Sequence, residues 1–325
     1  MTPDSRRDLL TEVAWLHHEF GLTQDEIARR FDVSRSTISR ALADAERLGI
    51  VQVVVTVPMP REARLAAELG ARLGVTATVG TRVAGEPPHV AAARAAARVM
   101  ERIGDGGGVT MALSWGRTLA AAAGLVRPRS TTGVRVVDAI GHPGASAVTP
   151  TVDVTRALAA ALGATVVHLP SPAFVAPGPS LAALLTSEPV RHALETARAA
   201  DVTFVSVGVA GEGSMLLGEG LIGADAMAAL VAAGAAGEVM GHWVDAAGTG
   251  LATPGLEEVG LTLDDLRASR RVVAVAGGAE KAPAVLAALR GRIVTELIVD
   301  DGLAASLLAH EPADGMSPEP HGDAR

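Results

Sequence analysis

The sequence predicts a two-domain α/β protein, in which a winged helix-turn-helix domain precedes a larger Rossmann-like domain. Two observations predict this architecture. Near the amino terminus, two short amphipathic helical segments are separated by a tight turn. From residue 61 onward, strand-like and helical segments alternate, a pattern typical of a mainly parallel sheet with helices on both faces. The 325 residues leave room for both domains.

Composition excludes several classes of protein. The chain has no cysteine, which excludes disulfides, thiolate zinc sites and cysteine nucleophiles. The charged amino terminus does not resemble a signal peptide, and no apolar run is long enough to cross a bilayer. We therefore expect a cytoplasmic protein that has no membrane contact, no cofactor and no metal. Because the formal net charge is −8, any nucleic-acid contact should be confined to a local basic surface.

The amino-terminal domain is expected to contain three helices and a wing. Residues 6–20 form a supporting helix whose inward side chains are Leu9, Leu10, Val13, Leu16 and Phe20. Thr23, followed three residues later by Glu26, predicts a capping box at the start of a second helix. Ser34 caps a third helix that runs to about Leu48, which closes its last turn. Residues 50–57 have strand composition and would form the wing.

The third helix presents a polar face suited to the major groove of DNA. Guanidinium groups pair bidentately with guanine, and short hydroxyls serve a base edge or a phosphate. The segment from residue 29 to residue 40 holds four arginines and one acid. Double-stranded DNA is therefore the expected partner, although a helical hairpin that packs on another protein is the alternative. The expected DNA-contacting residues are Thr23, Arg35, Ser36, Thr37, Ser39 and Arg40.

Two prolines around Met59 mark the boundary between the domains. We predict a DNA-binding domain over residues 1–57, a linker over 58–60, a ligand-binding α/β domain over 61–308 and a disordered tail over 309–325. In the second domain, the predicted helices span residues 61–73, 90–103, 117–125, 152–162, 189–199, 224–233 and 282–289. The predicted strands span residues 76–83, 109–113, 134–140, 165–169, 202–209, 272–276 and 296–299.

The loop after the strand at 109–113 has features of a phosphate site. It contains Ser114, Trp115, Gly116, Arg117 and Thr118, and it leads into a helix. Ligands collect at the carboxyl ends of parallel strands, and a helix amino terminus offers free N–H groups to an anion. The spacing differs from that of a P-loop, so no nucleoside triphosphate is expected. The alternative is an ordinary strand-to-helix turn capped by Ser114.

Lys281 is the only lysine in a chain that has 27 arginines. It follows the glycine turn at Gly278, and its retention suggests that a compact ammonium is needed there. A chance retention at an exposed helix start is the alternative. The glycine-rich exit at Gly208 is weak evidence for a site by itself. Asp245, at the end of another strand, could accept sugar hydroxyls or serve only its own turn.

Taken in order along the chain, these residues resemble the SorC family of sugar-responsive bacterial transcription regulators, sometimes grouped with the DeoR regulators. The resemblance covers nearly the whole chain, from about Leu9 to Leu308. The matching segments are Arg40-Ala41-Leu42, Ser114 to Thr118, the strand from Ala200 to Gly208, the turn from Gly234 to Glu238 before Asp245, and Ala276-Gly277-Gly278 with Lys281.

The resemblance implies an effector domain similar to sugar-phosphate isomerases and glucosamine-phosphate deaminases. It implies that the segment from Ser114 to Thr118 holds a phosphate and that Asp245 and Lys281 hold the sugar end. It also implies homodimers that pair into homotetramers. The opposing hypothesis is an isomerase-like or deaminase-like enzyme, for which we find no convincing pair of histidine and carboxylate near these loops. A third alternative is a Schiff base between Lys281 and an aldehyde sugar, which borohydride would trap.

Overall fold

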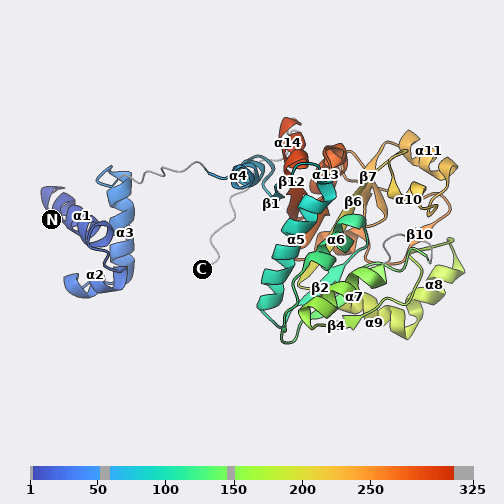
Figure 1. The fold of residues 1–325 in the computed structure, drawn as a ribbon, viewed down its shortest axis with the longest axis horizontal. Helices are drawn as coiled ribbons and strands as arrows, with labels where there is room; N and C mark the ends of the chain where they lie inside the picture. Colours follow the sequence, from blue (N-terminus) through green and yellow to red (C-terminus); the bar gives the residue numbers. More distant parts are fainter. Residues whose placement is uncertain (1–2, 52–58, 145–150, 311–325) are drawn as a thin grey trace. The chain divides into compact units, whose positions relative to one another are not determined.

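A computed structural model of the chain describes residues 3–51, 59–144 and 151–310. The chain divides into two compact units, Met1–Met59 and Pro60–Arg325, which are described separately (Figure 1). The predicted wing falls mainly on residues 52–58, and the predicted tail mainly on residues 311–325. Both segments lie outside the described residues.

The amino-terminal unit contains helices α1 (Pro3–His18), α2 (Gln24–Phe31) and α3 (Arg35–Arg47). The predicted caps are present: Thr23 and Glu26 form a capping box on α2, and the Ser34 side chain accepts a hydrogen bond from the Thr37 amide. The core is made by Val13, Leu16, Ile27, Ala28, Ile38 and Leu42.

Two apolar positions in this unit were predicted wrongly. Phe20 is 66% exposed and Leu48 is 54% exposed. Both residues lie beyond the last residue of their helix, so the helical periodicity no longer directs their side chains inward.

The second unit is built on a parallel sheet in the order β1-β12-β11-β6-β2-β3-β4. Its strands are β1 (Thr76–Gly80), β2 (Thr110–Leu113), β3 (Arg135–Asp138), β4 (Thr165–Val167), β6 (Val202–Val209), β11 (Val272–Ala276) and β12 (Glu296–Asp300). From β2 the chain continues outward to β3, whereas from β11 it continues to β12 on the other side of β6. Consecutive connections thus diverge around β6, and such a switch point creates a crevice at the carboxyl ends of the strands.

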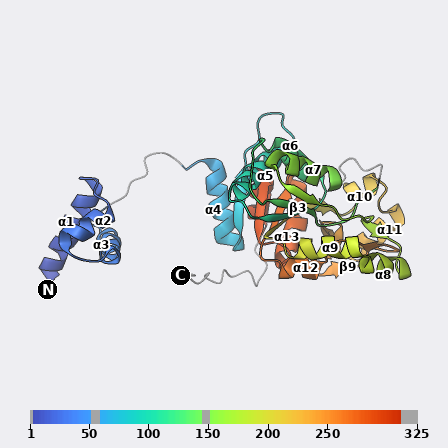
Figure 2. The same cartoon turned by 90° about the horizontal axis from the view of Figure 1, so that it is seen from below.

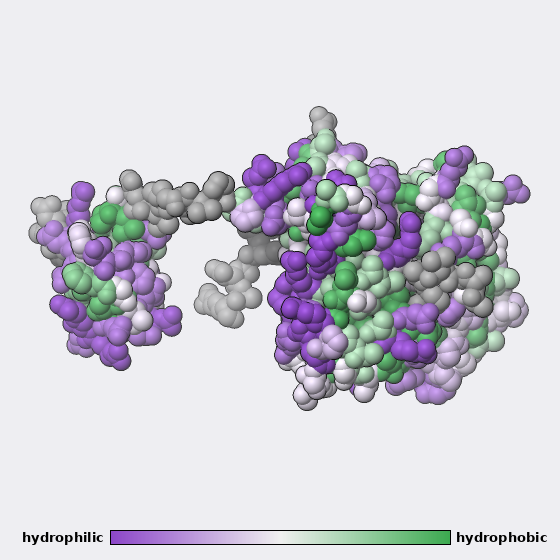
Figure 3. Space-filling view, in the orientation of Figure 1, coloured by the Kyte–Doolittle hydropathy of each residue, from purple (hydrophilic) through white to green (hydrophobic). Residues whose placement is uncertain are grey.

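Helices cover both faces of this sheet (Figure 2). One face packs against α5 (Pro88–Asp105), α6 (Arg117–Leu125) and α7 (Thr151–Leu162). The other packs against α4 (Arg61–Leu73), α13 (Ala282–Arg290) and α14 (Asp301–Ala309). Alternate residues of β6 serve the two cores, because Phe204 faces the first and Val205 the second. On α5, Arg98 and Arg102 are exposed, and hydrophilic residues gather over this helix in Figure 3.

An antiparallel extension of β6 was only partly predicted. It consists of β7 (Ala235–Val239), β8 (His242–Asp245) and β9 (Gly250–Leu251). The sequence had suggested a turn at residues 234–238, but that segment is the strand that pairs with the end of β6. The other elements are β5 (Phe174–Val175), α8 (Pro179–Thr186), α9 (Glu188–Arg198), α10 (Met215–Gly218), α11 (Ala224–Ala232), β10 (Glu257–Glu258), α12 (Leu263–Ala268) and the 3-10 turn η1 (Ala279–Lys281). No helix in the described ranges combines the length and apolar character needed to span a membrane.

Candidate functional site

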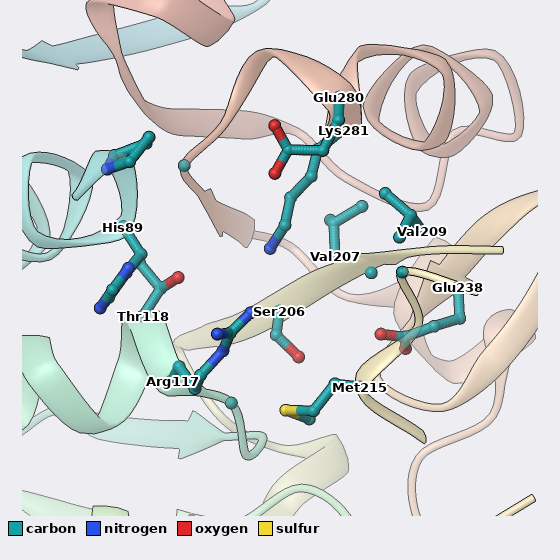
Figure 4. Close-up of a pocket in the computed structure, with 15 residues that line it drawn as sticks. His89, Arg117, Thr118, Ser206, Val207, Val209, Met215, Glu238, Glu280 and Lys281 are labelled. Atoms are coloured by element: carbon teal, nitrogen blue, oxygen red, sulfur yellow. The ribbon is translucent and has the colours of Figure 1, made fainter. Parts of the chain in front are cut away.

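A cavity of about 370 Å³ opens at the carboxyl ends of β2, β6 and β11 (Figure 4). Its walls come from five regions: the start of α5, the β2–α6 loop, the end of β6 with β7, the segment that leads into α10, and the turn η1. The lining residues are Pro88, His89, Gly116, Arg117, Thr118, Ser206, Val207, Gly208, Val209, Gly213, Met215, Glu238, Gly277, Glu280 and Lys281.

The β2–α6 loop is fixed from below by buried side chains. Ser114 is fully buried, and its Oγ accepts a hydrogen bond of 3.0 Å from the Ser206 amide. Trp115 is also buried and packs against Phe174, with 5.7 Å between the ring centroids. Neither residue lines the cavity, so both position the loop rather than contact a ligand. At Gly116, where φ is 123°, a Cβ atom would lie 2.9 Å from the Cβ of Ser206, and only glycine permits this approach.

Two cations point into the cavity without protein partners. The side chains of Arg117 and Lys281 approach its centre from opposite walls (Figure 4). Neither forms a side-chain hydrogen bond or an ion pair within the part of the chain that the structure describes. No side chain caps the first turn of α6, which leaves N–H groups beside Arg117 free for an anion. Burial, the main cause, and the nearby Arg117 charge lower the pKa of Lys281, although the Glu238 carboxylate opposes this shift.

Like Glu280, Glu238 contributes an acidic side chain to the cavity wall. It lies opposite Gly208 in the β6–β7 register, and a Cβ at position 208 would lie 2.1 Å from its Oε1 atom. Its Oε2 atom accepts a hydrogen bond of 2.5 Å from the Gly241 amide. Burial raises the pKa of Glu238 to about 7, although the Gly241 hydrogen bond and the Lys281 charge act in the opposite direction.

The predicted effector residues therefore separate into two groups. Gly116, Arg117, Thr118, Gly208 and Lys281 meet at one cavity. Ser114, Trp115, Gly278 and Asp245 do not line it. The Gly278 amide instead donates to the buried Asp300 carboxylate, which ties the β11 loop to the start of α14.

Asp245 serves its own turn. Its Oδ1 atom accepts hydrogen bonds from the amides of Ala247 and Thr249, at 2.9 and 2.8 Å. The turn packs at the carboxyl end of α13, where Gly248 contacts Gly291, whereas the cavity lies at the amino end of that helix. The observed contacts of Asp245 therefore agree with the alternative that it serves only its own turn.

Four polar lining residues were not among the predicted ligands: His89, Ser206, Glu238 and Glu280. A signal existed for Glu238, because an acid within an otherwise small and apolar strand segment is unusual. His89 had no such signal, because its place in the cavity depends on the packing of α5 against the β11 exit. A Cβ at Gly277 would lie 2.7 Å from the His89 backbone.

The candidate DNA surface lies on the other unit. Arg35, Ser36, Thr37, Ser39 and Arg40 are exposed on α3, as is the α2 cap Thr23. Arg35 lies 3.8 Å from Asp25, in a weak exposed ion pair that DNA could replace. Ser34 bonds the side chains of Ser36 and Thr37, at 2.8 Å each, which orders the first turn of α3.

Comparison with known proteins identifies both units. A family model described as "MarR family" matches residues 13–58, and the family described as "Putative sugar-binding domain" matches residues 59–309. The transcriptional regulator LsrR of Enterobacter sp. (strain 638) is 28% identical over 318 residues, which cover 94% of each chain. The erythritol catabolism regulatory protein EryD of Brucella abortus (strain 2308) is 27% identical, over 94% of this chain and 98% of that protein.

The fold agrees with these relatives. The full-length sorbitol operon regulator SorC from Klebsiella pneumoniae matches with a TM-score of 0.72 at 24% identity, over 94% of this chain and 99% of that one. The sugar-binding family match alone spans well over half of the chain. Proteins of this kind are transcriptional regulators rather than enzymes. The chain belongs to the SorC family of sugar-binding transcriptional regulators.

Proposed function

We propose that this regulator binds operator DNA through α3 and that a phosphorylated sugar or polyol in the β2/β6/β11 cavity controls that binding. The observation that carries the proposal is the pair of unpartnered cations, Arg117 and Lys281, in a cavity beside an uncapped helix amino terminus. An anion is the ligand that such an arrangement stabilises.

The phosphoryl group would lie against the start of α6. Its oxygens would accept hydrogen bonds from the backbone amides near Gly116 and Thr118 and from the Arg117 guanidinium. The Ser114–Ser206 hydrogen bond holds this loop in place before a ligand arrives, which lowers the entropy lost on binding.

The hydroxyl end would lie between Lys281 and Glu238. A buried carboxyl group accepts hydrogen bonds from hydroxyls when ionised and also donates one when protonated. Because two relatives are named for erythritol catabolism and for the sorbitol operon, polyols and their phosphates are the first ligands to test.

Control of DNA binding would act through the assembly. We propose a cytoplasmic homodimer or homotetramer in which the effector shifts the packing between effector domains. The recognition helices of two copies must match half-sites about one helical turn apart, or a multiple of it, so a change of packing alters operator affinity.

The test is a thermal-shift screen of sugars, polyols and their phosphates, followed by operator titration with each hit. A ligand that prefers the native state at about 100 times its Kd adds about 2.7 kcal/mol to the free energy of unfolding. We expect a phosphorylated hit whose shift disappears in Arg117→Ala and which changes operator affinity. A shift that persists in this variant would place the ligand elsewhere and contradict the phosphate assignment.

A further inference from the structure

His89 is held rigidly in the wall of the effector cavity. It is the second residue of α5, which begins with Pro88, and proline at this position favours the helical start. The backbone of His89 abuts Gly277 at the exit of β11, with no space for a side chain between them. The imidazole is therefore positioned by a helix and a central strand rather than by a mobile loop (Figure 4).

The ring of His89 has no hydrogen-bonding partner among the described residues, and, besides burial, the charges that lower its pKa are those of two cations. The structure gives its ring no hydrogen bond or ion pair within the described residues. Charged side chains line the cavity from three other elements, Arg117 on α6, Glu238 on β7, and Glu280 and Lys281 on η1. Burial is the main cause that lowers the pKa of His89, and the charges of Arg117 and then Lys281 add to the effect.

A bound phosphoryl group would reverse this balance. A phosphate monoester carries about −1.5 to −2 charges near neutral pH, so it would offset both cations and favour an imidazolium beside it. A neutral sugar hydroxyl in the same place would supply no such charge. The neutral ring would then make a single ordinary hydrogen bond.

We propose that His89 takes up a proton when a phosphorylated effector binds, and that it thereby selects phosphoryl groups over hydroxyl groups. This inference rests on the proposed phosphate site and adds a third, conditional cation to it. The sign follows from linkage: a group whose pKa is raised by the ligand strengthens binding at low pH. That contribution is lost as the pH rises through the pKa of the bound form.

Inorganic sulfate is the probe. Because sulfate remains a dianion throughout the neutral range, any proton taken up when it binds must go to the protein and not to the ligand. The protein is labelled with ¹³C-histidine and titrated with acid in sodium sulfate and in sodium chloride of equal ionic strength. His89→Gln assigns the His89 signal, and the other histidines serve as internal controls. We expect sulfate to raise the pKa of His89 and to leave that of the exposed His192 unchanged.

Sulfate affinity should then fall with rising pH in the wild type, by up to about tenfold for each unit by which sulfate raises the His89 pKa. His89→Gln should lose this part of the pH dependence and keep only the part that comes from Glu238, whose pKa of about 7 lies in the same range. His192→Gln should behave as wild type. Sulfate that shifts the amide signals of Gly116 to Thr118 without moving the His89 titration would overturn this inference and leave the phosphate site standing. If sulfate leaves those amides unchanged, the phosphate site itself is wrong, and this inference fails with it.

Discussion

The Arg117 guanidinium and the Lys281 ammonium face each other across one cavity, and neither forms an ion pair or a hydrogen bond with a carboxylate among the described side chains. Two like charges held this way repel each other in the free protein, and an anion between them removes the repulsion. The cavity therefore favours an anionic ligand because the starts of α6 and η1 hold these two cations on opposite walls.

Lys281→Arg should weaken the effector response although it keeps the charge. A planar guanidinium is larger than an ammonium and cannot occupy the same half-buried position without displacing its neighbours. The measurement is the effector concentration that half-maximally changes operator affinity, and we expect it to rise by about tenfold or more. An unchanged value would mean that Lys281 was retained by chance and has no role in effector binding.

The Schiff-base alternative for Lys281 has its own test. The protein is treated with an aldose phosphate and borohydride, and a Schiff base would be trapped as a single mass increment on Lys281, the only lysine in the chain.

Arg40→Ala should strongly weaken specific operator binding and leave effector binding intact. Loss of a bidentate contact to guanine costs about 1–3 kcal/mol and relaxes specificity at that base pair. Fluorescence anisotropy with operator DNA measures the first effect, and the effector thermal shift measures the second. Arg47→Ala is the matched control, because Arg47 lies on the same helix but pairs with Asp44. Simultaneous loss of both activities would argue against two separate functional units.

Glu238→Gln should remove a pH dependence of stability. In the folded protein the pKa of Glu238 is about 7, against an ordinary value of 4.5. A raised carboxyl pKa means that stability is greatest below about pH 4.5 and falls as the pH rises through about 7. The difference corresponds to about 3 kcal/mol at alkaline pH. Urea unfolding from pH 5 to about pH 8 should therefore show a steeper loss for the wild type than for the variant, and parallel curves would contradict the burial argument.

Glu101→Gln should destabilise the protein with the opposite pH signature. Hydrogen bonds from the Arg127 side chain and backbone lower the pKa of the buried Glu101 to about 2. A lowered carboxyl pKa gives stability that is present above about pH 4.5 and is lost as the pH falls through about 2. We expect the variant to lose about 1–3 kcal/mol at neutral pH. Circular dichroism during acid titration should show the difference shrinking toward low pH.

Asp245→Ala should leave the effector response unchanged. It removes two hydrogen bonds within a turn at the far end of α13, so the expected cost is about 1–2 kcal/mol of stability. The comparison with Glu238→Ala in the same operator assay is decisive, because only Glu238 lines the cavity. A weaker effector response in Asp245→Ala at full folding would restore the ligand role that the sequence suggested.

Much of the fold could be predicted because it is encoded locally. The Thr23–Glu26 capping box and the Ser34 cap lie within four residues of the groups they bind, and they mark the starts of α2 and α3 correctly. Apolar periods predicted α4 and β6 to the residue. Because parallel strands present their carboxyl ends at one edge, the strand-exit loops of Arg117 and Lys281 were also correctly expected to meet.

What local patterns left open was decided by long-range pairing. Glu238 and Asp245 lie on adjacent antiparallel strands, and of these two acids only Asp245 was expected from the sequence to hold the sugar end. The pairing of Gly208 with Glu238 brings Glu238 to the cavity, and the hairpin carries Asp245 to the other end of α13. The register of these strands depends on packing between segments about thirty residues apart. Local sequence patterns therefore could not predict which residues would pair. The position of His89 has the same origin, because it follows from the contact between α5 and Gly277 that only the assembled core creates.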